Sequence, residues 1–346
     1  MSKTLSHRNY LWIFATLVLA FFGGLVFVLL SLPLPWLLGP MFICLVAALL
    51  GARIEGPPVL GDAMRTILGV AVGASITPDV ISRVPEMATS LMLIPPYIMV
   101  IGLAGYPFFR RVCGLDKATS YYGAMPGGLQ DMLLFGEEAG GNVRHLSLLH
   151  ATRVLIVVTA LPVVMTLGLG LSLDQPIGAA ARELPLNELL IMAGLAGAGW
   201  WVAKKIGLFG ASILGPMILA AIASLTGLIH SRPPAEAILL AQYFIGLSIG
   251  VKYVGVTWAE LRRVVLSAIG YTLIILVIAF FFAEAAVFLG LAPQASALLA
   301  FSPGGQAEMT VLAIVAGVDL AYVVTHHLTR IVVVILGAPL VAKFLK

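Results

Sequence analysis

The residues best suited to chemistry occur twice in this chain, about 177 positions apart. Each set combines a Pro-Gly-Gly turn, a nearby amide, a carboxylate and a later His-x-Thr-Arg stretch. The first set is Pro126, Gly127, Gly128, Gln130, Asp131, His150, Thr152 and Arg153, and the second is Pro303, Gly304, Gly305, Gln306, Glu308, His327, Thr329 and Arg330. In both sets the carboxylate precedes the histidine by 19 residues. Matched ionisable groups in an apolar chain predict a site between the two halves.

Each Pro-Gly-Gly turn predicts a break in a helix. Proline removes a backbone donor, and glycine lets other atoms approach the exposed backbone amides. The half-helix that follows would present its positive N-terminal end, which attracts an anion. Asp131 and Glu308 fall in the first turn of that half-helix, where a carboxylate can also act simply as a cap. A structural kink with a capping acid is therefore the alternative to a binding site.

Two arginines lie deep within apolar segments. Arg153 and Arg330 each sit roughly ten residues inside their segments, too far from the ends for easy snorkelling. A lone guanidinium group at that depth is costly, so each one needs a carboxylate, a carbonyl or a bound anion as its partner. We expect Asp131 and Glu308 to be the fixed partners. A purely structural arginine–carboxylate clamp is an alternative that is compatible with transport.

Two histidines precede these arginines by three residues. His150 and His327 should lie on the same helical face as Arg153 and Arg330. Near neutral pH an imidazole could carry a proton in a coupled cycle. A neutral histidine that is hydrogen-bonded within the helix bundle is an equal alternative.

The composition indicates a membrane protein. Hydrophobic residues make up 60% of the chain and charged residues 10%, with a mean hydropathy of +1.06. A water-soluble fold would have to expose an apolar surface that monomers rarely tolerate. The stretch from Leu11 to Leu30 is long enough to span about 30 Å of hydrocarbon. Residues 31–36 contain no small-residue cleavage site, so we expect a retained helix and not a signal peptide.

Several function classes have little support in the sequence. The net charge of +4 is small and its basic residues are scattered, so binding to nucleic acid is not expected. Cys44 and Cys113 show no metal-binding or disulfide spacing, and we expect no metal and no cofactor. The expected partners are membrane lipid, a small solute and a coupling ion, and a homodimer stays open.

The apolar stretches divide into six per half. They run at 11–31, 35–51, 60–78, 86–108, 118–136 and 145–171, and then at 187–203, 210–229, 235–251, 264–290, 294–317 and 319–344. We therefore predict a first membrane repeat at 1–172, a polar linker at 173–185 and a second membrane repeat at 186–346.

The distribution of Lys and Arg predicts that the repeats are inverted, because cytoplasmic loops carry the excess. If all twelve segments cross the bilayer, ten basic residues lie inside and seven outside. If each Pro-Gly-Gly element enters and leaves by one face, the count is fourteen to three. The same distribution of Lys and Arg results if the Pro-Gly-Gly element crosses the bilayer as a broken helix and a different segment fails to cross.

The predicted fold is thus an all-α polytopic membrane protein of two inverted repeats. Each repeat has about five crossing helices plus a broken or re-entrant Pro-Gly-Gly element. We place it in the bacterial inner membrane with both termini in the cytoplasm.

Two doubled motifs carry a family resemblance. Leu38-Gly39-Pro40-Met41 returns as Leu214-Gly215-Pro216-Met217, beside the doubled Pro-Gly-Gly-x-x-acid-Met motif. Together they resemble the bacterial AbrB-type integral membrane family over roughly residues 10–344. Members of that family are called regulators of gene expression or ammonia monooxygenases. The family also distantly resembles the cation:proton antiporter and bile-acid symporter group, whose inverted repeats contain broken helices.

We expect a secondary transporter and not an enzyme. Its solute would be a small anion or zwitterion, coupled to protons or sodium, with export as one direction. A core made of 118–171 and 294–344 would move against the earlier helices. An indirect role in regulating gene expression is the alternative. A monooxygenase is less favoured, because copper needs converging imidazoles and only His150 and His327 recur.

Overall fold

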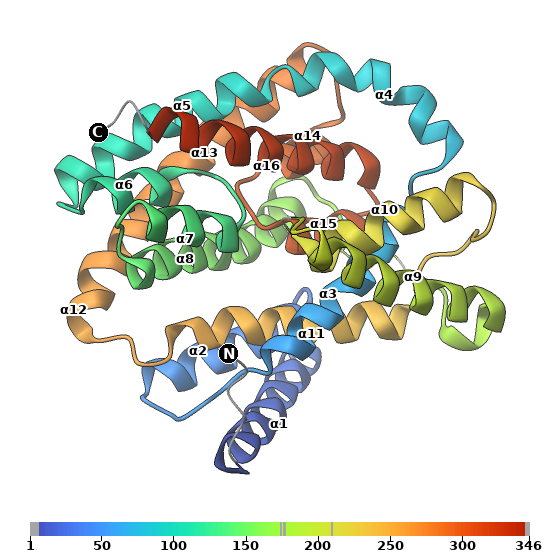
Figure 1. Ribbon diagram of the computed structural model, residues 1–346, viewed down its shortest axis with the longest axis horizontal. Helices are drawn as coiled ribbons and strands as arrows, with labels where there is room; N and C mark the ends of the chain where they lie inside the picture. The colour runs from blue at the N-terminus through green and yellow to red at the C-terminus, as the bar shows by residue number, and fades with distance from the viewer. Residues whose placement is uncertain (1–6, 174, 176–177, 209, 343–346) are drawn as a thin grey trace. The chain divides into compact units, whose positions relative to one another are not determined.

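The regular structure of this chain is entirely helical in the part that the computed structural model describes, residues 7–173, 175, 178–208 and 210–342 (Figure 1). Seven helical segments there are long and apolar enough to cross a membrane. They are Tyr10–Leu29, Pro85–Val112, Val143–Gly168, Leu186–Lys205, Ala235–Tyr253, Trp258–Phe288 and Leu320–Ala342. The predicted all-α, membrane-type fold is therefore confirmed.

The helices form two compact units, and each unit takes segments from both halves of the sequence. Unit 1 comprises Met1–Ile76 and Leu173–Val256, and unit 2 comprises Thr77–Ser172 and Thr257–Lys346. The two predicted membrane repeats, 1–172 and 186–346, follow the duplication along the sequence, and they stay a prediction. The compact units group the same helices differently, because each unit combines helices from both predicted repeats.

Unit 1 contains the two helices that carry the Leu-Gly-Pro-Met motifs and the helices around them. They are α1 (His7–Leu29), α2 (Pro35–Leu49), α3 (Pro58–Gly73), η3 (Ala181–Glu183), α9 (Leu186–Lys205), α10 (Ala211–Leu225), α11 (Ala235–Gly250) and η4 (Val251–Tyr253). Helix α1 packs on α2, and α9 packs on α10. Both contacts join glycine to glycine, Gly23 with Gly39 and Gly199 with Gly215. The glycine of each Leu-Gly-Pro-Met motif therefore lets two helix backbones approach closely.

The other contacts of unit 1 are exchanged between the halves. Helix α11 of the second half packs on α2 of the first, and α3 of the first half packs on α10 of the second. Glycines again face backbone, and the pairs are Gly246 with Leu37, Gly250 with Met41, Gly69 with Ile213 and Gly73 with Met217. A side chain at any of these glycines would collide with the neighbouring helix, so unit 1 depends on close backbone contacts.

Unit 2 contains the Pro-Gly-Gly elements. Its helices are α4 (Pro78–Leu91), α5 (Ile94–Pro107), η1 (Phe108–Val112), α6 (Lys117–Ala124), α7 (Leu129–Glu138), α8 (Val143–Val163), η2 (Val164–Gly168), α12 (Trp258–Glu260), η5 (Leu261–Val265), α13 (Leu266–Phe288), α14 (Gln294–Phe301), α15 (Gln306–Val315) and α16 (Leu320–Ala342). Helices α6, α7 and α8 begin 177 residues before α14, α15 and α16. The duplicated sequence thus forms matching local structure in both copies.

Each Pro-Gly-Gly element folds back on itself. The two short arms contact each other, α6 with α7 and α14 with α15. In the first copy, the backbone N–H of Asn142, which follows α7, donates to the hydroxyl of Thr119 at the start of α6, over 2.7 Å. In the second copy, Pro293 before α14 and Asp319 after α15 line one cavity. Both ends of each element therefore lie close together.

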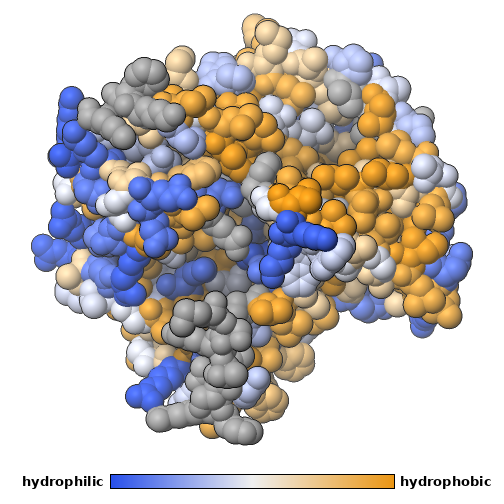
Figure 2. Space-filling model, in the orientation of Figure 1, coloured by the Kyte–Doolittle hydropathy of each residue, from blue (hydrophilic) through white to orange (hydrophobic). Residues whose placement is uncertain are grey.

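Apolar side chains cover much of the exterior. Phe14 on α1 and Phe281 on α13 are 65% and 66% exposed, and many neighbours on these helices are also apolar and exposed. Figure 2 shows broad apolar areas on the face in view. Surfaces of this kind are stable when lipid covers them.

We predict that Gly246→Ala destabilises the protein. The new Cβ would collide with the Leu37 carbonyl oxygen, which belongs to a helix backbone and cannot rotate away. Overpacking of this kind costs about 1–3 kcal/mol, and thermal unfolding in detergent measures the loss. Gly194→Ala in α9 is the matched control, because nothing lies within 4 Å of its Cβ position. Equal melting temperatures for the two variants would contradict the close-contact interpretation.

Candidate functional site

The helix breaks lie where the sequence predicts them. Helix α6 ends at Ala124 and α7 begins at Leu129, while α14 ends at Phe301 and α15 begins at Gln306. The residues on either side of each break are extended, so the chain leaves one helix and enters the next through an unwound segment. Pro126 and Pro303 are buried within these segments.

Two side chains explain why each break needs a pair of glycines. A Cβ on Gly127 would lie 2.8 Å from the Met132 Cε, and a Cβ on Gly304 would lie 2.7 Å from the Met309 Cε. The second glycine of each pair makes room for the acid. The carboxylate of Asp131 occupies the place of a Cβ on Gly128, and Glu308 does the same at Gly305. The Pro-Gly-Gly-x-x-acid-Met motif is therefore one packed unit at a helix N-terminus.

Both carboxylates lie in the first turn of their helices. Asp131 is in the first turn of α7 and Glu308 in that of α15. A negative charge there is stabilised by the positive end of the helix dipole. Glu308 is 8% exposed, and Asp131 is half-buried. The acids thus lie at the sites where a bound anion would otherwise be favoured.

The arginines bind the other side of each break. Arg153 of α8 is 3% exposed and donates through Nη1 to the Met125 carbonyl, over 3.0 Å, and through Nη2 to the Gly127 carbonyl, over 3.2 Å. The second copy repeats this geometry, with Arg330 of α16 donating to Ser302 over 2.6 Å and to Gly304 over 2.8 Å. Each guanidinium group therefore bridges the unwound segment.

The expected pairing of these arginines with Asp131 and Glu308 is wrong, because their hydrogen bonds end on carbonyl oxygens. The physical reason is the shortage of donors at the end of a helix. The last carbonyls of a helix have no partner within it, and they carry the negative end of its dipole. A planar guanidinium group can reach the carbonyl directly after the helix and a second carbonyl of the unwound segment at once. The arginines thus cap the first half-helix, while the acids stabilise the second.

Two tyrosines donate hydrogen bonds to the last carbonyls of α6 and α14. Each tyrosine belongs to the half of the sequence opposite to the helix that it caps. Tyr271 of α13 donates to the Ala124 carbonyl at the end of α6, over 2.7 Å. Tyr97 of α5 donates to the Phe301 carbonyl at the equivalent end of α14. Each half therefore supplies a hydroxyl to the break in the other half.

Sequence reasoning did not find these tyrosines. The two do not occupy equivalent positions at the 177-residue offset, since Tyr97 would correspond to Ile274. They also lie in ordinary apolar helices, away from the doubled motifs. A buried tyrosine needs a hydrogen-bond partner, which is the one signal that points to them.

The histidines also face the ends of the first half-helices. His327 Nε2 contacts the Leu299 carbonyl of α14 at 2.9 Å. His150 faces the equivalent Tyr122 carbonyl, but at a geometry too loose for a hydrogen bond. Both histidines are 1% exposed. This arrangement favours the alternative in which the histidines are neutral and structural.

The remaining predicted residues surround the same breaks. Thr152 is 1% exposed, and Thr329 is half-buried. Gln306 opens α15, and its buried Nε2 has no hydrogen-bond partner among the described residues. The side chain of Gln130 lies outside the described residues. No group of three His, Cys, Asp or Glu side chains in the described part of the chain could hold a metal ion.

The two breaks belong to one unit and lie near each other in it. Helix α8, which carries Arg153, contacts α15 of the second copy. The charges of Arg153 and Arg330 are close enough to interact. Two unwound segments and the N-termini of α7 and α15 thus gather in unit 2, where exposed backbone amides could hold a small anionic group.

We predict that Arg330→Lys destabilises the fold. A single ammonium group reaches one carbonyl and leaves the other unsatisfied, which costs about 1.5–3 kcal/mol. The melting temperature in detergent should therefore fall, while Arg262→Lys on the exposed surface of η5 should leave it unchanged. An unchanged melting temperature for Arg330→Lys would show that the bridge does not support the break.

Comparison with known proteins gives consistent matches over almost the whole chain. The sequence model of the family described as "Transition state regulatory protein AbrB" matches residues 36–346. "Uncharacterized protein YhjN" of Bacillus subtilis (strain 168) is 28% identical, over 92% of this chain and 88% of that protein. "Putative regulator AbrB" of Escherichia coli (strain K12) is 24% identical, over 95% of this chain and 94% of that protein. The match includes both Pro-Gly-Gly breaks and the arginines that bridge them, and the chain belongs to the AbrB family.

Proposed function

We propose that this protein is a secondary transporter, and not an enzyme, that carries a small anionic or zwitterionic solute through the bacterial inner membrane. Movement of the solute would be coupled to protons or sodium. The observation that carries the proposal is the pair of helix breaks gathered in unit 2. Broken helices at corresponding positions of two repeats are the usual place for a substrate in transporters.

The geometry of each break supports binding at the N-terminal ends. Side chains cap the C-terminal ends of α6 and α14, as Arg153 and Arg330 show. The N-termini of α7 and α15 follow directly, and their dipoles favour a negatively charged group. The ligands of the anionic group in this proposal are therefore backbone amides and Gln306, and the two acids are the groups that would bind the coupling proton or sodium ion. The arginines maintain the unwound segments.

The folded-back shape of the two elements supports the inverted topology. Arms of eight and ten residues, as in α14 and α15, extend about 12 and 15 Å at 1.5 Å per residue. Each element therefore reaches the middle of a hydrocarbon core about 30 Å thick and leaves it by the same face. Each repeat then crosses the bilayer an odd number of times, which inverts the second repeat relative to the first.

The division into two units supports alternating access. The predicted mobile core, 118–171 and 294–344, falls in unit 2 as far as the described residues extend. Transporters of this kind work by movement of one rigid bundle against another. We propose unit 2 as the bundle that carries the solute.

A regulatory role is the second candidate, because the family description and the name of the E. coli relative both refer to regulation. An indirect effect on gene expression is compatible with a carrier whose solute is itself a signal. A regulator without flux would be distinguished by the first experiment below.

Solute flux into proteoliposomes tests the transport proposal. We expect saturable uptake of at least one small anion or zwitterion from a labelled metabolite mixture. Glu308→Gln should reduce it at least tenfold and lower the melting temperature only slightly, because a first-turn charge worth about 0.3–1 kcal/mol is lost while a side chain of the same size is kept. Glu183→Gln, at an exposed position, is the matched control. Folded protein that moves no member of the mixture would contradict the proposal.

Cysteine labelling tests the inverted topology. The two native cysteines, Cys44 and Cys113, are first replaced. Ala139→Cys and Ala316→Cys then report on equivalent positions after α7 and α15. We expect an impermeant reagent added outside cells to label position 316 and to reach position 139 only after permeabilisation. Labelling of positions 139 and 316 from the same side of the membrane would contradict the inverted arrangement.

A further inference from the structure

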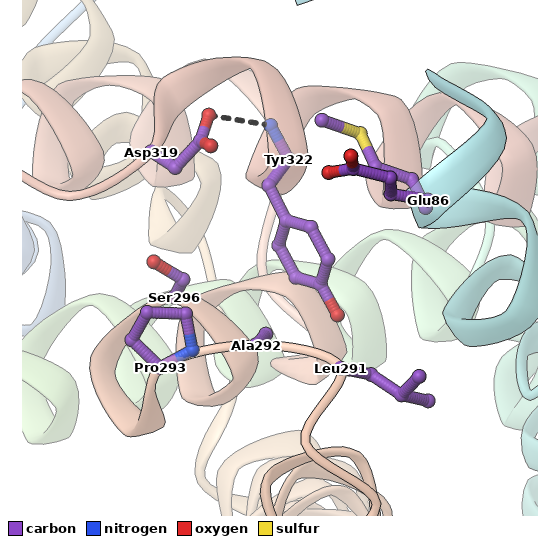
Figure 3. Close-up of a pocket in the computed structure, with 8 residues that line it drawn as sticks. Glu86, Leu291, Ala292, Pro293, Ser296, Asp319 and Tyr322 are labelled. Atoms are coloured by element: carbon purple, nitrogen blue, oxygen red, sulfur yellow. Dashed lines mark hydrogen bonds between the residues drawn. The ribbon is translucent and has the colours of Figure 1, made fainter. Parts of the chain in front are cut away.

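A buried histidine of unit 2 contacts the wall of a small cavity and the border of the second helix break. His326 of α16 is 0% exposed, and its ring centroid lies 4.0 Å from that of Tyr322 and 5.7 Å from that of Phe301. Phe301 is the last residue of α14, directly before the unwound segment. Tyr322 and Met87 line a cavity of about 130 Å³ at the start of α16 (Figure 3). His326 is therefore placed between the cavity and the break.

Both ring nitrogens of His326 have oxygen partners. Nδ1 lies 2.8 Å from the Tyr322 carbonyl oxygen, and Nε2 lies 2.9 Å from the Ser90 hydroxyl oxygen. A carbonyl oxygen only accepts, so Nδ1 carries a hydrogen. The Ser90 hydroxyl has a second acceptor, the Met87 carbonyl oxygen, at 2.9 Å. The hydrogen of this hydroxyl can therefore point either to Nε2 or to Met87.

This geometry accommodates two protonation states of the ring. In the neutral ring, Nδ1–H donates to Tyr322 and the Ser90 hydroxyl donates to Nε2. In the cationic ring, Nε2–H donates to Ser90, and the Ser90 hydroxyl donates to Met87 instead. Uptake of a proton thus needs the rotation of one O–H bond, and every buried N–H keeps an acceptor. A histidine with a purely structural role needs partners for one of these states only.

The neighbouring aromatic rings favour the cationic state. An aromatic ring attracts a cation that lies within about 6 Å of its centroid, and the rings of Tyr322 and Phe301 both meet this distance. The other two buried histidines are less well prepared. Nδ1 of His327 and both nitrogens of His150 have no partner among the described residues. A second N–H on either ring would be buried without an acceptor, so protonation is favoured at His326.

Other ionisable groups lie on α16 and on the helices that pack against it. His327 is close enough to His326 for their charges to interact. Tyr97 of α5 donates to the Phe301 carbonyl, and α14 itself has no ionisable side chain. The charged side chains that the structure describes in this region are Glu86 of α4, Glu308 of α15, Arg330 of α16 and Asp319 directly before α16. A test of protonation must therefore report on His326 itself.

We propose that His326 is a proton-binding site on the route by which the coupling proton enters from this cavity. The cavity has room for water, because one water molecule needs about 10–15 Å³. The Ser90 hydroxyl gives its hydrogen to Nε2 and regains one from water through the adjacent Tyr322 hydroxyl, so that one proton leaves the water. The inference rests on the proposed function, and it selects a proton over sodium as the coupling ion.

Nitrogen NMR of the full-length protein in detergent tests proton binding without any solute. Histidine is isotope-labelled, and the His326 signals are assigned by their loss in His326→Gln. We expect a neutral ring with its hydrogen on Nδ1 at about pH 8, and a doubly protonated ring on titration toward about pH 4. A His326 ring that stays neutral until the protein unfolds would overturn the proposal.

Ser90→Ala tests the hydroxyl that makes both states possible. The cationic ring loses a charge-assisted hydrogen bond and the neutral ring loses a weaker one. The ratio of cationic to neutral His326 at a given pH should therefore fall roughly fivefold or more. Ser248→Ala is the matched control, because the Ser248 hydroxyl also donates to a carbonyl three residues earlier, that of Ile245, in α11 of unit 1. An unchanged ratio in Ser90→Ala would contradict the proposed route.

Solute accumulation in proteoliposomes tests the link to transport. His326→Gln should lose accumulation driven by a pH gradient, whereas exchange of solute at equal pH on both sides needs no net proton entry and should persist. His230→Gln, at an exposed position of unit 1, is the control. Gradient-driven accumulation that persists in His326→Gln would overturn the role in coupling. Absence of flux in the unaltered protein would contradict the transport proposal, and the NMR titration would still decide whether His326 binds a proton.

Discussion

The structure depends on how backbone carbonyls are satisfied where a helix stops inside an apolar bundle. Water is not available there to bond the last carbonyls of α6 and α14, so side chains must do so. In each copy a tyrosine hydroxyl binds the last carbonyl of the helix and a histidine faces an earlier one, while an arginine bridges two carbonyls of the unwound segment that follows. This explains why charged residues persist so deep in the chain. The unwound segments could not remain open without them.

Many of the contacts that hold the fold together are made between the two copies, including those that satisfy the carbonyls at the breaks. Tyr97 and Tyr271 each cap the break of the opposite copy, and in unit 1 the third helix of each copy packs on the second helix of the other. One copy alone would leave carbonyls without donors and glycine faces without a neighbour. The duplication is therefore needed for stability as well as for the symmetry of the site.

The two copies differ where the helices reach their ends. At the breaks, the hydrogen bonds of Arg153 and Arg330 correspond atom for atom. At the start of α8 the Asn142 side chain accepts from the backbone N–H of His145, whereas at the start of α16 the Asp319 carboxylate accepts from the backbone N–H of Tyr322. Symmetry is thus retained in the contacts that satisfy the backbone, while the charge of the capping side chain differs between the copies.

The sequence by itself determined the membrane class, the duplication and the positions of both breaks. Proline and glycine act on the local backbone, so their effect can be predicted from neighbours along the chain. The tertiary structure decided which groups meet at the breaks. It showed that Arg153 and Arg330 bind carbonyls, where we had expected the carboxylates of Asp131 and Glu308, and it brought in Tyr97 and Tyr271, whose partners are 204 and 147 residues away. A side chain of given type accepts several partners, and only packing determines which of them lies within reach.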